Sequence, residues 1–369
     1  MLQFLLVLSI ASMVGLQGWR TLLNNFAVEW VHLEGSHIGV IQSVREVPGF
    51  LALMAVWVML LVREHRLSAI SILVLGAGVG ATGYFPSFAG VAATTMLLSF
   101  GFHYYETTNQ SLTLQYFDHL TAPRVLGAVR SISAATNIAV GGLVYIMSWY
   151  MNYREMFLAL GLMVTGFGIW GLTRNPVDRE MVPQSKRMVF KWKYGLFYFL
   201  TFMAGARRQI FVAFSVFLLV KVFAFNVREV TILFVINNVI SYFTAPMIGK
   251  AIIRYGERRV LSLEYAGLVF VFLAYAVTGS RWVAAGLYVL DNLLFNFSMA
   301  VRTYFQKVAD PQDIAPSMAV GFTINHIAAV VLPVIGGLLW VVDYRIPFVF
   351  AAVLSLFSLV AVQRIKIKP

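Results

Sequence analysis

Charged residues interrupt the apolar stretches of the chain at a few places, twice as direct neighbours. Arg207 and Arg208 follow one another in one stretch, and Arg45 precedes Glu46 in another. Because a guanidinium group binds a carboxylate or phosphate through two parallel hydrogen bonds, the arginine pair is a candidate anion-binding site. The alternative for Arg207 and Arg208 is ion pairing with Asp291 or another acid. The alternative for Arg45 and Glu46 is pairing across helix interfaces.

Three acids lie well inside apolar stretches: Glu46, Glu106 and Asp291. Burial raises the pKa of a carboxyl group and a nearby arginine lowers it, so a movable contact between the two can take up and release a proton. We predict that these acids carry protons, Asp291 first, because Asn292 and Asn296 give it polar surroundings. The alternatives are structural: Asp291 neutralises an arginine of the stretch 194–221, and Glu106 pairs with Arg130.

Further polar residues in these stretches are candidates for contacting a solute. The predicted substrate-binding residues are Arg45, Tyr105, Asn137, Arg207, Arg208, Asn237, Asn292, Asn296 and His326. The imidazole of His326 titrates near neutral pH, and its alternative role is hydrogen-bonded packing. His103 and Glu106 have the i, i+3 spacing of a metal-binding pair, but no second pair accompanies them, so we predict no metal site and no cofactor.

The composition shows which solvent surrounds these residues. Of 369 residues, 60% are apolar and only 12% are charged, and the mean hydropathy is +0.79. A soluble domain has about 25% charged residues, so we predict an all-α membrane protein. The net charge of +12 then indicates basic cytoplasmic loops and no nucleic-acid partner. The absence of cysteine excludes disulfides and thiolate metal sites.

Twelve apolar stretches are long enough to cross a bilayer, which takes about 20 helical residues. We predict transmembrane helices at residues 3–26, 37–62, 68–86, 88–117, 122–149, 153–172, 194–221, 227–253, 260–279, 282–306, 314–341 and 344–363. If the N-terminus is cytoplasmic, seventeen Lys and Arg residues lie in the inner loops and the C-terminal tail, and five lie outside. This bias predicts that both termini are cytoplasmic.

The two sets of six helices resemble each other at an offset near 194. The stretches 122–149 and 314–341 share two features. Each has an Ala-Pro pair at its start, and each has a Gly-Gly pair in its later part. Internal duplication of a six-helix unit is typical of one large class of transporters. We predict two pseudo-symmetric six-helix bundles, at 1–172 and 194–369, joined by a cytoplasmic linker at 173–193.

One loop resembles a family signature. Residues 249–259 resemble the G-x-x-x-D-R-x-G-R-R loop of the major facilitator superfamily, with Ile253 in place of the Asp. The matching residues are Gly249, Arg254, Gly256, Arg258 and Arg259. Residues 333–337 resemble the P-x-x-G-G ending of the family's antiporter motif, here in the eleventh helix instead of the fifth. The resemblance implies a bundle of six plus six helices, a central cavity that opens alternately to each side, and a gating role for the loop.

The distribution of charges supports this resemblance. The family places its third, sixth, ninth and twelfth helices on the outside of the bundle. The corresponding stretches have no charge in their interior, apart from Glu264, which we place near the cytoplasmic start of 260–279. Charged and amide side chains lie in the other helices, where the resemblance implies contact with the cavity.

We therefore expect a secondary transporter that moves a small organic solute, with an anionic solute favoured, and that is coupled to protons. The alternative in the same class is a multidrug or metabolite exporter. Alternatives from other classes are an enzyme that acts on lipid, for which no constellation of residues is evident, and a non-transporting receptor. We expect the solute and the lipid bilayer as partners, and a monomer in the inner membrane of a bacterium.

The predicted topology can be tested by labelling single cysteines, because the native chain has none. A Ser185→Cys variant should react with a membrane-impermeant maleimide only from the cytoplasmic side, and Ser280→Cys only from the outside. Labelling is measured in intact cells and in inverted membrane vesicles. The opposite pattern of labelling would refute the predicted orientation.

Overall fold

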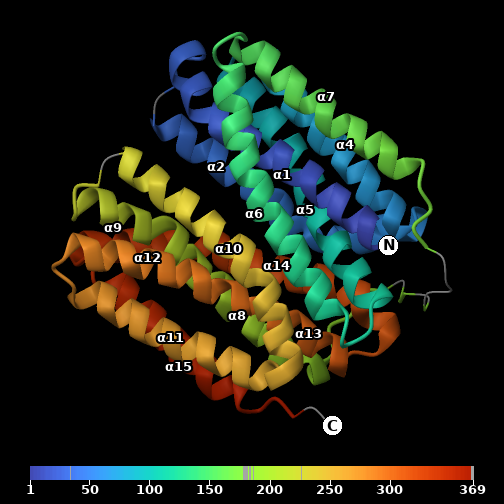
Figure 1. The fold of residues 1–369 in the computed structure, drawn as a ribbon, viewed down its shortest axis with the longest axis vertical. Coiled ribbons are helices and arrows are strands. Elements are labelled where there is room, and N and C mark those ends of the chain that lie inside the picture. The colour runs from blue at the N-terminus through green and yellow to red at the C-terminus, as the bar shows by residue number, and fades with distance from the viewer. Residues whose placement is uncertain (34, 178–181, 183, 186, 226, 367–369) are drawn as a thin grey trace. The chain divides into compact units, whose positions relative to one another are not determined.

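A computed structural model of the chain describes all residues except 34, 178–181, 183, 186, 226 and 367–369. The described residues form helices joined by short loops, without a strand (Figure 1). The predicted linker 173–193 is described only in part, because residues 178–181, 183 and 186 lie outside the described residues.

The helices coincide with the predicted stretches to within four residues at each end. In the first half of the chain they are α1 (Leu2–Asn25), η1 (Phe26–Trp30), α2 (Gly35–Phe50), η2 (Leu51–Met54), α3 (Ala55–Leu61), α4 (Glu64–Thr82), α5 (Phe88–Tyr116), α6 (Ala122–Met147) and α7 (Tyr153–Leu172). In the second half they are η3 (Trp192–Tyr194), α8 (Gly195–Ile210), η4 (Phe211–Ser215), α9 (Val216–Lys221), α10 (Val227–Tyr255), α11 (Glu257–Val277), α12 (Arg281–Phe295), η5 (Asn296–Ser298), α13 (Met299–Val308), η6 (Pro311–Asp313), α14 (Ile314–Val342) and α15 (Ile346–Val362).

Three of the predicted helices are interrupted. The stretch 37–62 changes to a 3₁₀ turn after Pro48, which has no N–H to donate to the preceding turn. The stretch 194–221 contains a π-helical turn, η4, just after Arg208, and the stretch 282–306 contains a 3₁₀ turn that begins at Asn296. Such irregular turns inside helices are frequent at functional sites. One of the interruptions here begins three residues after the candidate Arg208, and another begins at the candidate Asn296.

Eight segments of the described chain are long and apolar enough to cross a membrane. They are Leu2–Leu23, Val40–Met59, Glu64–Thr82, Ala122–Met147, Tyr153–Leu172, Glu229–Tyr255, Glu257–Val277 and Arg281–Val308, and the shorter Ile346–Val362 is also apolar. The protein is therefore a multi-pass membrane protein. The count of twelve spans stays a prediction.

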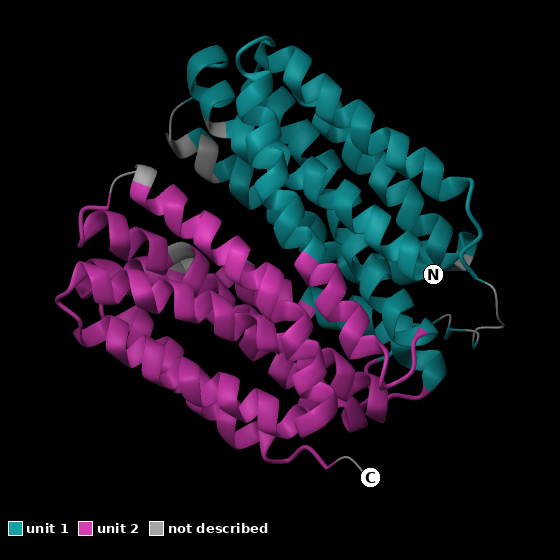
Figure 2. Cartoon of the chain, in the orientation of Figure 1, with its two compact units in different colours: residues 1–116, 132–189, 311–323 teal, residues 117–131, 190–310, 324–369 magenta. Residues whose placement is uncertain are grey.

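The chain forms two compact units (Figure 2). Unit 1 comprises residues 1–116, 132–189 and 311–323, and unit 2 comprises residues 117–131, 190–310 and 324–369. The unit boundaries fall inside α6 and α14, so each of these helices contributes to both units. The predicted division into bundles at 1–172 and 194–369 stays a proposal.

Small residues hold the helices of unit 1 together. Helix α4 packs against α5 and α7. A Cβ atom on Gly161 of α7 would lie 2.4 Å from the Cα of Gly80 in α4, and one on Gly101 of α5 would lie 2.4 Å from the backbone nitrogen of Leu75. Because lipid tails are as apolar as the helix surfaces, such close backbone contact is a main source of helix association in membranes.

Aromatic and aliphatic side chains fill the core of unit 2. The rings of Phe197 in α8 and Phe305 in α13 stack with their centroids 4.1 Å apart. Leu219, Phe225 and Tyr288 belong to a second buried cluster, which joins α9, α10 and α12. Helix α11 packs against α15, which also contacts α8. These contacts bring α8, α11, α12 and α15 close to one another within one unit.

The glycines of α7 provide a test of this packing. Gly161→Ala should destabilise the protein by about 1–3 kcal/mol, because the added methyl group overlaps the backbone of α4. Gly166→Ala, on the same helix, meets open space and should be neutral or stabilising by up to about 1 kcal/mol through helix propensity. Thermal unfolding in detergent measures both. Equal stability of the two variants would contradict the packing described.

Candidate functional site

A buried arginine is the centre of a charged cluster in unit 2. The side chain of Arg207 in α8 is 3% exposed. Its Nη2 lies 3.9 Å from Oε1 of Glu264 in α11, which is 1% exposed, and its Nη1 donates a hydrogen bond to Oγ of Ser358 in α15. Its guanidinium carbon also lies 4.5 Å from the ring centroid of Tyr265. The guanidinium of Arg207 thus joins α8 to two other helices, α11 and α15.

Asp291 of α12 adds a second acid to this cluster. It is 2% exposed and lies within electrostatic reach of Arg207 and Glu264. Among the described residues, Oδ2 of Asp291 and Oε2 of Glu264 have no hydrogen-bond partner. In the same part of the chain, Arg207 is the one Lys or Arg that interacts electrostatically with these two acids. The cluster therefore contains one guanidinium and two carboxyl groups in the interior of a membrane-spanning unit.

Glu264 is not among the site residues predicted from the sequence. We placed it apart from the other acids, near the cytoplasmic start of an outer helix, yet it is buried against Arg207. The sequence does contain an indication of this contact, because an acid within an otherwise apolar span requires a partner. The alternative that Arg207 pairs with an acid is confirmed, with Glu264 as the ion-pair partner.

Arg208 has a different environment from its neighbour. Successive residues on a helix point about 100° apart, and Arg208 is exposed while Arg207 is buried. Its guanidinium carbon lies 5.5 Å from the ring centroid of Phe295 in α12. No carboxylate pairs with Arg208 among the described residues.

Amide side chains form a hydrogen-bonded network, also in unit 2. The side chain of Asn292 donates to Oγ of Ser241 at 3.2 Å and to the backbone carbonyl of Asn237 at 3.4 Å. Asn296 donates to the same Oγ at 3.0 Å and accepts from Nε of Arg130 at 2.9 Å. The network joins α10, α12, η5 and the first turns of α6. It brings together three of the predicted substrate-binding residues.

In unit 1 the predicted acids and arginine have local partners. Arg45 pairs with Glu46 at 2.6 Å on the same helix. Glu106 accepts from Gln110 one turn later, at 2.7 Å. Because Arg130 bonds to Asn296 in unit 2, the structure gives both members of the expected Glu106–Arg130 pair other partners.

The other candidates are divided between the units. The buried hydroxyl of Tyr105 lies 2.8 Å from Oγ of Ser9 in unit 1. Asn137 is half-buried on the part of α6 that belongs to unit 1, and His326 is buried on the part of α14 that belongs to unit 2. The role of these three residues in substrate binding stays a prediction.

The glycines of the predicted gating loop have distinct conformational roles. A Cβ on Gly249 would lie 2.4 Å from the carbonyl oxygen of Pro123, so the glycine allows α6 to approach α10. Gly256 has φ +78°, which only glycine adopts readily, and it caps the start of α11. Gly256 thereby lets the chain reverse between α10 and α11.

Two charged residues at this loop, Arg258 and Glu257, contact other elements of unit 2. Arg258 donates from Nε to Oε1 of Gln363 at 3.1 Å, while Arg254 lies over the ring of Tyr255 and Arg259 is exposed. Glu257, which the signature does not include, is fully buried and pairs with Lys307 of α13 at 2.8 Å. The buried pair anchors the loop, and sequence spacing offered no sign of it.

A third ionic contact lies beyond the end of α13. The carboxylate of Asp310 accepts hydrogen bonds from Lys193 and from Lys191, the latter at 3.3 Å, and these bonds hold its pKa below the usual range. Its backbone N–H donates to the hydroxyl of Tyr194 at 3.0 Å. These contacts attach the start of η3 and α8 to the end of α13.

Comparison with known proteins finds likeness in structure only, since no protein-family model and no curated protein matches the sequence. A bacterial homologue of the iron transporter ferroportin has a TM-score of 0.79 at 14% identity, over 98% of each chain. The human organic anion transporter MFSD10 (TETRAN) has a TM-score of 0.77 at 12% identity, also over 98% of each chain. The Major Facilitator Superfamily transporter FucP has a TM-score of 0.79 at 12% identity, over 99% of this chain and 98% of its own.

Each of these structures matches the chain along almost its whole length. Two are transporters, and the third is a homologue of a transporter. At identities of 12–14% the likeness is one of fold, because such distant chains share their helix arrangement but few side chains. The likeness in fold to this superfamily, which the loop 249–259 indicates, is thus confirmed. The chain is a multi-pass membrane protein with the fold of the major facilitator superfamily of transporters.

Proposed function

We propose that the protein is a secondary active transporter that moves a small organic solute by alternating access and is driven by protons. The fold supports transport. The similar structures are described as a fucose:proton symporter, an organic anion transporter and a homologue of an iron transporter. Since their cargoes differ, the fold alone does not select a solute, and the side chains of this chain must support the choice.

The observation that best supports proton coupling is the balance of charges around Arg207. If Asp291 and Glu264 were both ionised, one negative charge would lie uncompensated in the interior of a membrane-spanning unit, which is costly. One proton shared by the two acids removes this charge. A change in the contact between Arg207 and either acid would alter the proton affinity of the cluster. Proton binding would then be linked to conformation.

The proposed coupling residues are Asp291 first, then Glu264, with Glu106 and Glu46 as further candidates. Glu46 is a weaker candidate because Arg45 neutralises it on its own helix. In the cluster, the surrounding titratable groups are Tyr265 and Tyr275 of α11 and Tyr288 of α12. No basic group other than Arg207 is seen there among the described residues, so the two acids share a single counter-charge.

The preference for an anionic solute rests on Arg208. It is exposed, has no carboxylate partner in the described part of the chain, and lies over an aromatic ring. We propose that Arg208 binds a carboxylate or phosphate of the solute and that Asn292, Asn296 and Asn237 add hydrogen bonds. Arg45, Tyr105, Asn137, Arg207 and His326 remain proposed contacts with the solute.

The proposal includes twelve spans in two six-helix bundles, cytoplasmic termini and linker, and a monomer in a bacterial inner membrane. The five residues Gly249, Arg254, Gly256, Arg258 and Arg259 form the proposed gating loop. An exporter of drugs or metabolites is the alternative within this class. It is favoured by residues 333–337, which resemble the P-x-x-G-G ending of the family's antiporter motif.

Proton coupling predicts the behaviour of Asp291→Asn in proteoliposomes. A pH difference of one unit drives up to roughly tenfold accumulation at one proton per solute, since one unit is worth about 1.4 kcal/mol. The variant should lose this accumulation but keep solute binding and exchange across the membrane. Glu264→Gln should show the same separation. Exchange confirms that each variant is folded, and full accumulation by both variants would exclude the cluster as the coupling site.

The anion site predicts that Arg208→Lys weakens solute binding by roughly tenfold, because one of two charge-assisted hydrogen bonds is lost. Arg154→Lys is the matched control, since Arg154 also lies over an aromatic ring, that of Tyr84, but has no proposed role. Apparent affinity is measured from uptake of candidate organic anions. If Arg208→Lys and Arg207→Lys both bind and transport like the wild type, the anion site is wrong.

A further inference from the structure

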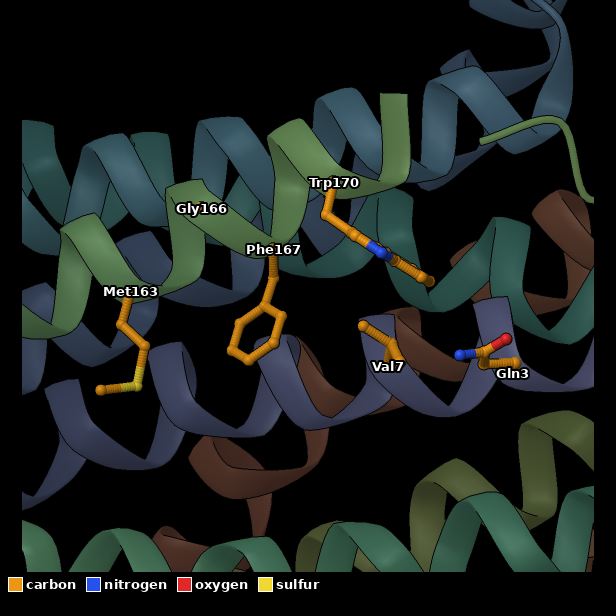
Figure 3. Close-up of a pocket in the computed structure, with 6 residues that line it drawn as sticks. All are labelled: Gln3, Val7, Met163, Gly166, Phe167 and Trp170. Carbon is orange, nitrogen blue, oxygen red and sulfur yellow. The ribbon is translucent and has the colours of Figure 1, made fainter. Parts of the chain in front are cut away.

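A groove of about 430 Å³ lies between α1 and α7 in unit 1, remote in sequence from every residue of the proposed transport site (Figure 3). In the close-up the side chains of α7 point from their helix toward α1. The residues that line the groove are Gln3, Val7, Met163, Gly166, Phe167 and Trp170. Apart from the amide of Gln3, its walls are apolar side chains and a glycine.

The groove exists because Gly166 has no side chain. A Cβ on Gly166 would have no atom within 4 Å, whereas a Cβ on Gly161, Gly168 or Gly171 of the same helix would press against α1 or α4. The other three glycines therefore serve packing, and Gly166 leaves space. A larger side chain at this position would fill the groove without disturbing a helix contact.

One end of the groove is polar and cationic. Gln3 lies there, and the guanidinium carbon of Arg174 lies 5.4 Å from the ring centroid of Trp170. Both side chains are exposed. Among the described residues, no carboxylate pairs with Arg174 and no hydrogen bond engages the amide of Gln3. The groove thus combines apolar walls with an available cation and amide at one end.

The size and position of the groove identify its occupant. Helices α1 and α7 contain candidate membrane spans, with Gln3 and Trp170 near the ends of those spans. From Met163 to Trp170 the groove follows about 10 Å of helix, roughly two-thirds of one leaflet of a bilayer core. A transmembrane helix would run the whole core and is about 10–12 Å wide, so the groove is too short for one. A single acyl chain fits this length and these walls.

We propose that the groove binds one acyl chain of an anionic phospholipid, whose phosphate is held by Arg174 and the amide of Gln3. An acyl chain gains little by leaving other lipid tails for an apolar groove. The charge at Arg174 therefore supplies the selectivity for an anionic headgroup. The space at Gly166 gives the groove a shape that accepts an acyl chain. The site is independent of the proposed transport function, because none of its residues belongs to the charge cluster or the amide network.

Native mass spectrometry tests the proposal, with the full chain first delipidated in detergent and then supplied with phosphatidylglycerol or phosphatidylcholine. The wild type should retain one phosphatidylglycerol with roughly fivefold preference over phosphatidylcholine, as one basic residue contributes about 1 kcal/mol near an anionic headgroup. Arg174→Gln should abolish the preference. Gly166→Leu should abolish retention of either lipid.

Two variants serve as matched controls. Gly142→Leu adds the same side chain where a Cβ also meets open space, and Arg66→Gln removes another exposed arginine of unit 1. Both should retain phosphatidylglycerol like the wild type. Retention by Gly166→Leu, an unchanged preference in Arg174→Gln, or a wild type without preference would each overturn the proposal. Arg174→Gln changes only an exposed side chain, so its result stands even if Gly166→Leu fails to fold.

Discussion

The cost of burying charge inside a membrane-spanning unit constrains the whole of unit 2. Arg207 lies at 3% exposure because Glu264, Ser358 and Tyr265 surround it with an acid, a hydroxyl and an aromatic face. These partners come from α11 and α15, so one guanidinium holds three helices in register. Removing Arg207 would leave two buried acids without a counter-charge, and breaking a buried ion pair in this way typically costs about 3–5 kcal/mol. With Asp291, the same cluster holds more acid than base, and this imbalance links structure to the proposed function.

In unit 1, two of the predicted acids have partners on their own helices. Arg45 neutralises its neighbour Glu46, and Glu106 bonds to Gln110 one turn away. Helices α4, α5 and α7 then associate through glycine contacts that need no charge. Charges that are satisfied within one helix do not depend on the position of other helices. This difference is why the coupling hypothesis is centred on unit 2.

The glycines of α7 illustrate two uses of a missing side chain. Gly161 allows the backbone of α7 to touch that of α4, whereas Gly166 leaves a groove beside α1. Both residues are glycines on α7, and they differ only in what lies next to them. Likewise the adjacent arginines Arg207 and Arg208 differ in role because a helix turns about 100° per residue. One points into the core of unit 2, and the other is exposed.

The sequence by itself determined the helical class, the membrane environment and the position of each helix, because hydrophobic length and turn residues act over neighbouring positions. It also located Asp291, Arg207 and the loop 249–259. It did not determine which charges meet. Glu264 contacts Arg207, Asn296 contacts Arg130 across 166 residues, and Lys307 contacts Glu257 across 50. Only the tertiary structure decided these partners, since the pairing of buried charges depends on how helices pack, and packing is set by side-chain volumes on several helices at once.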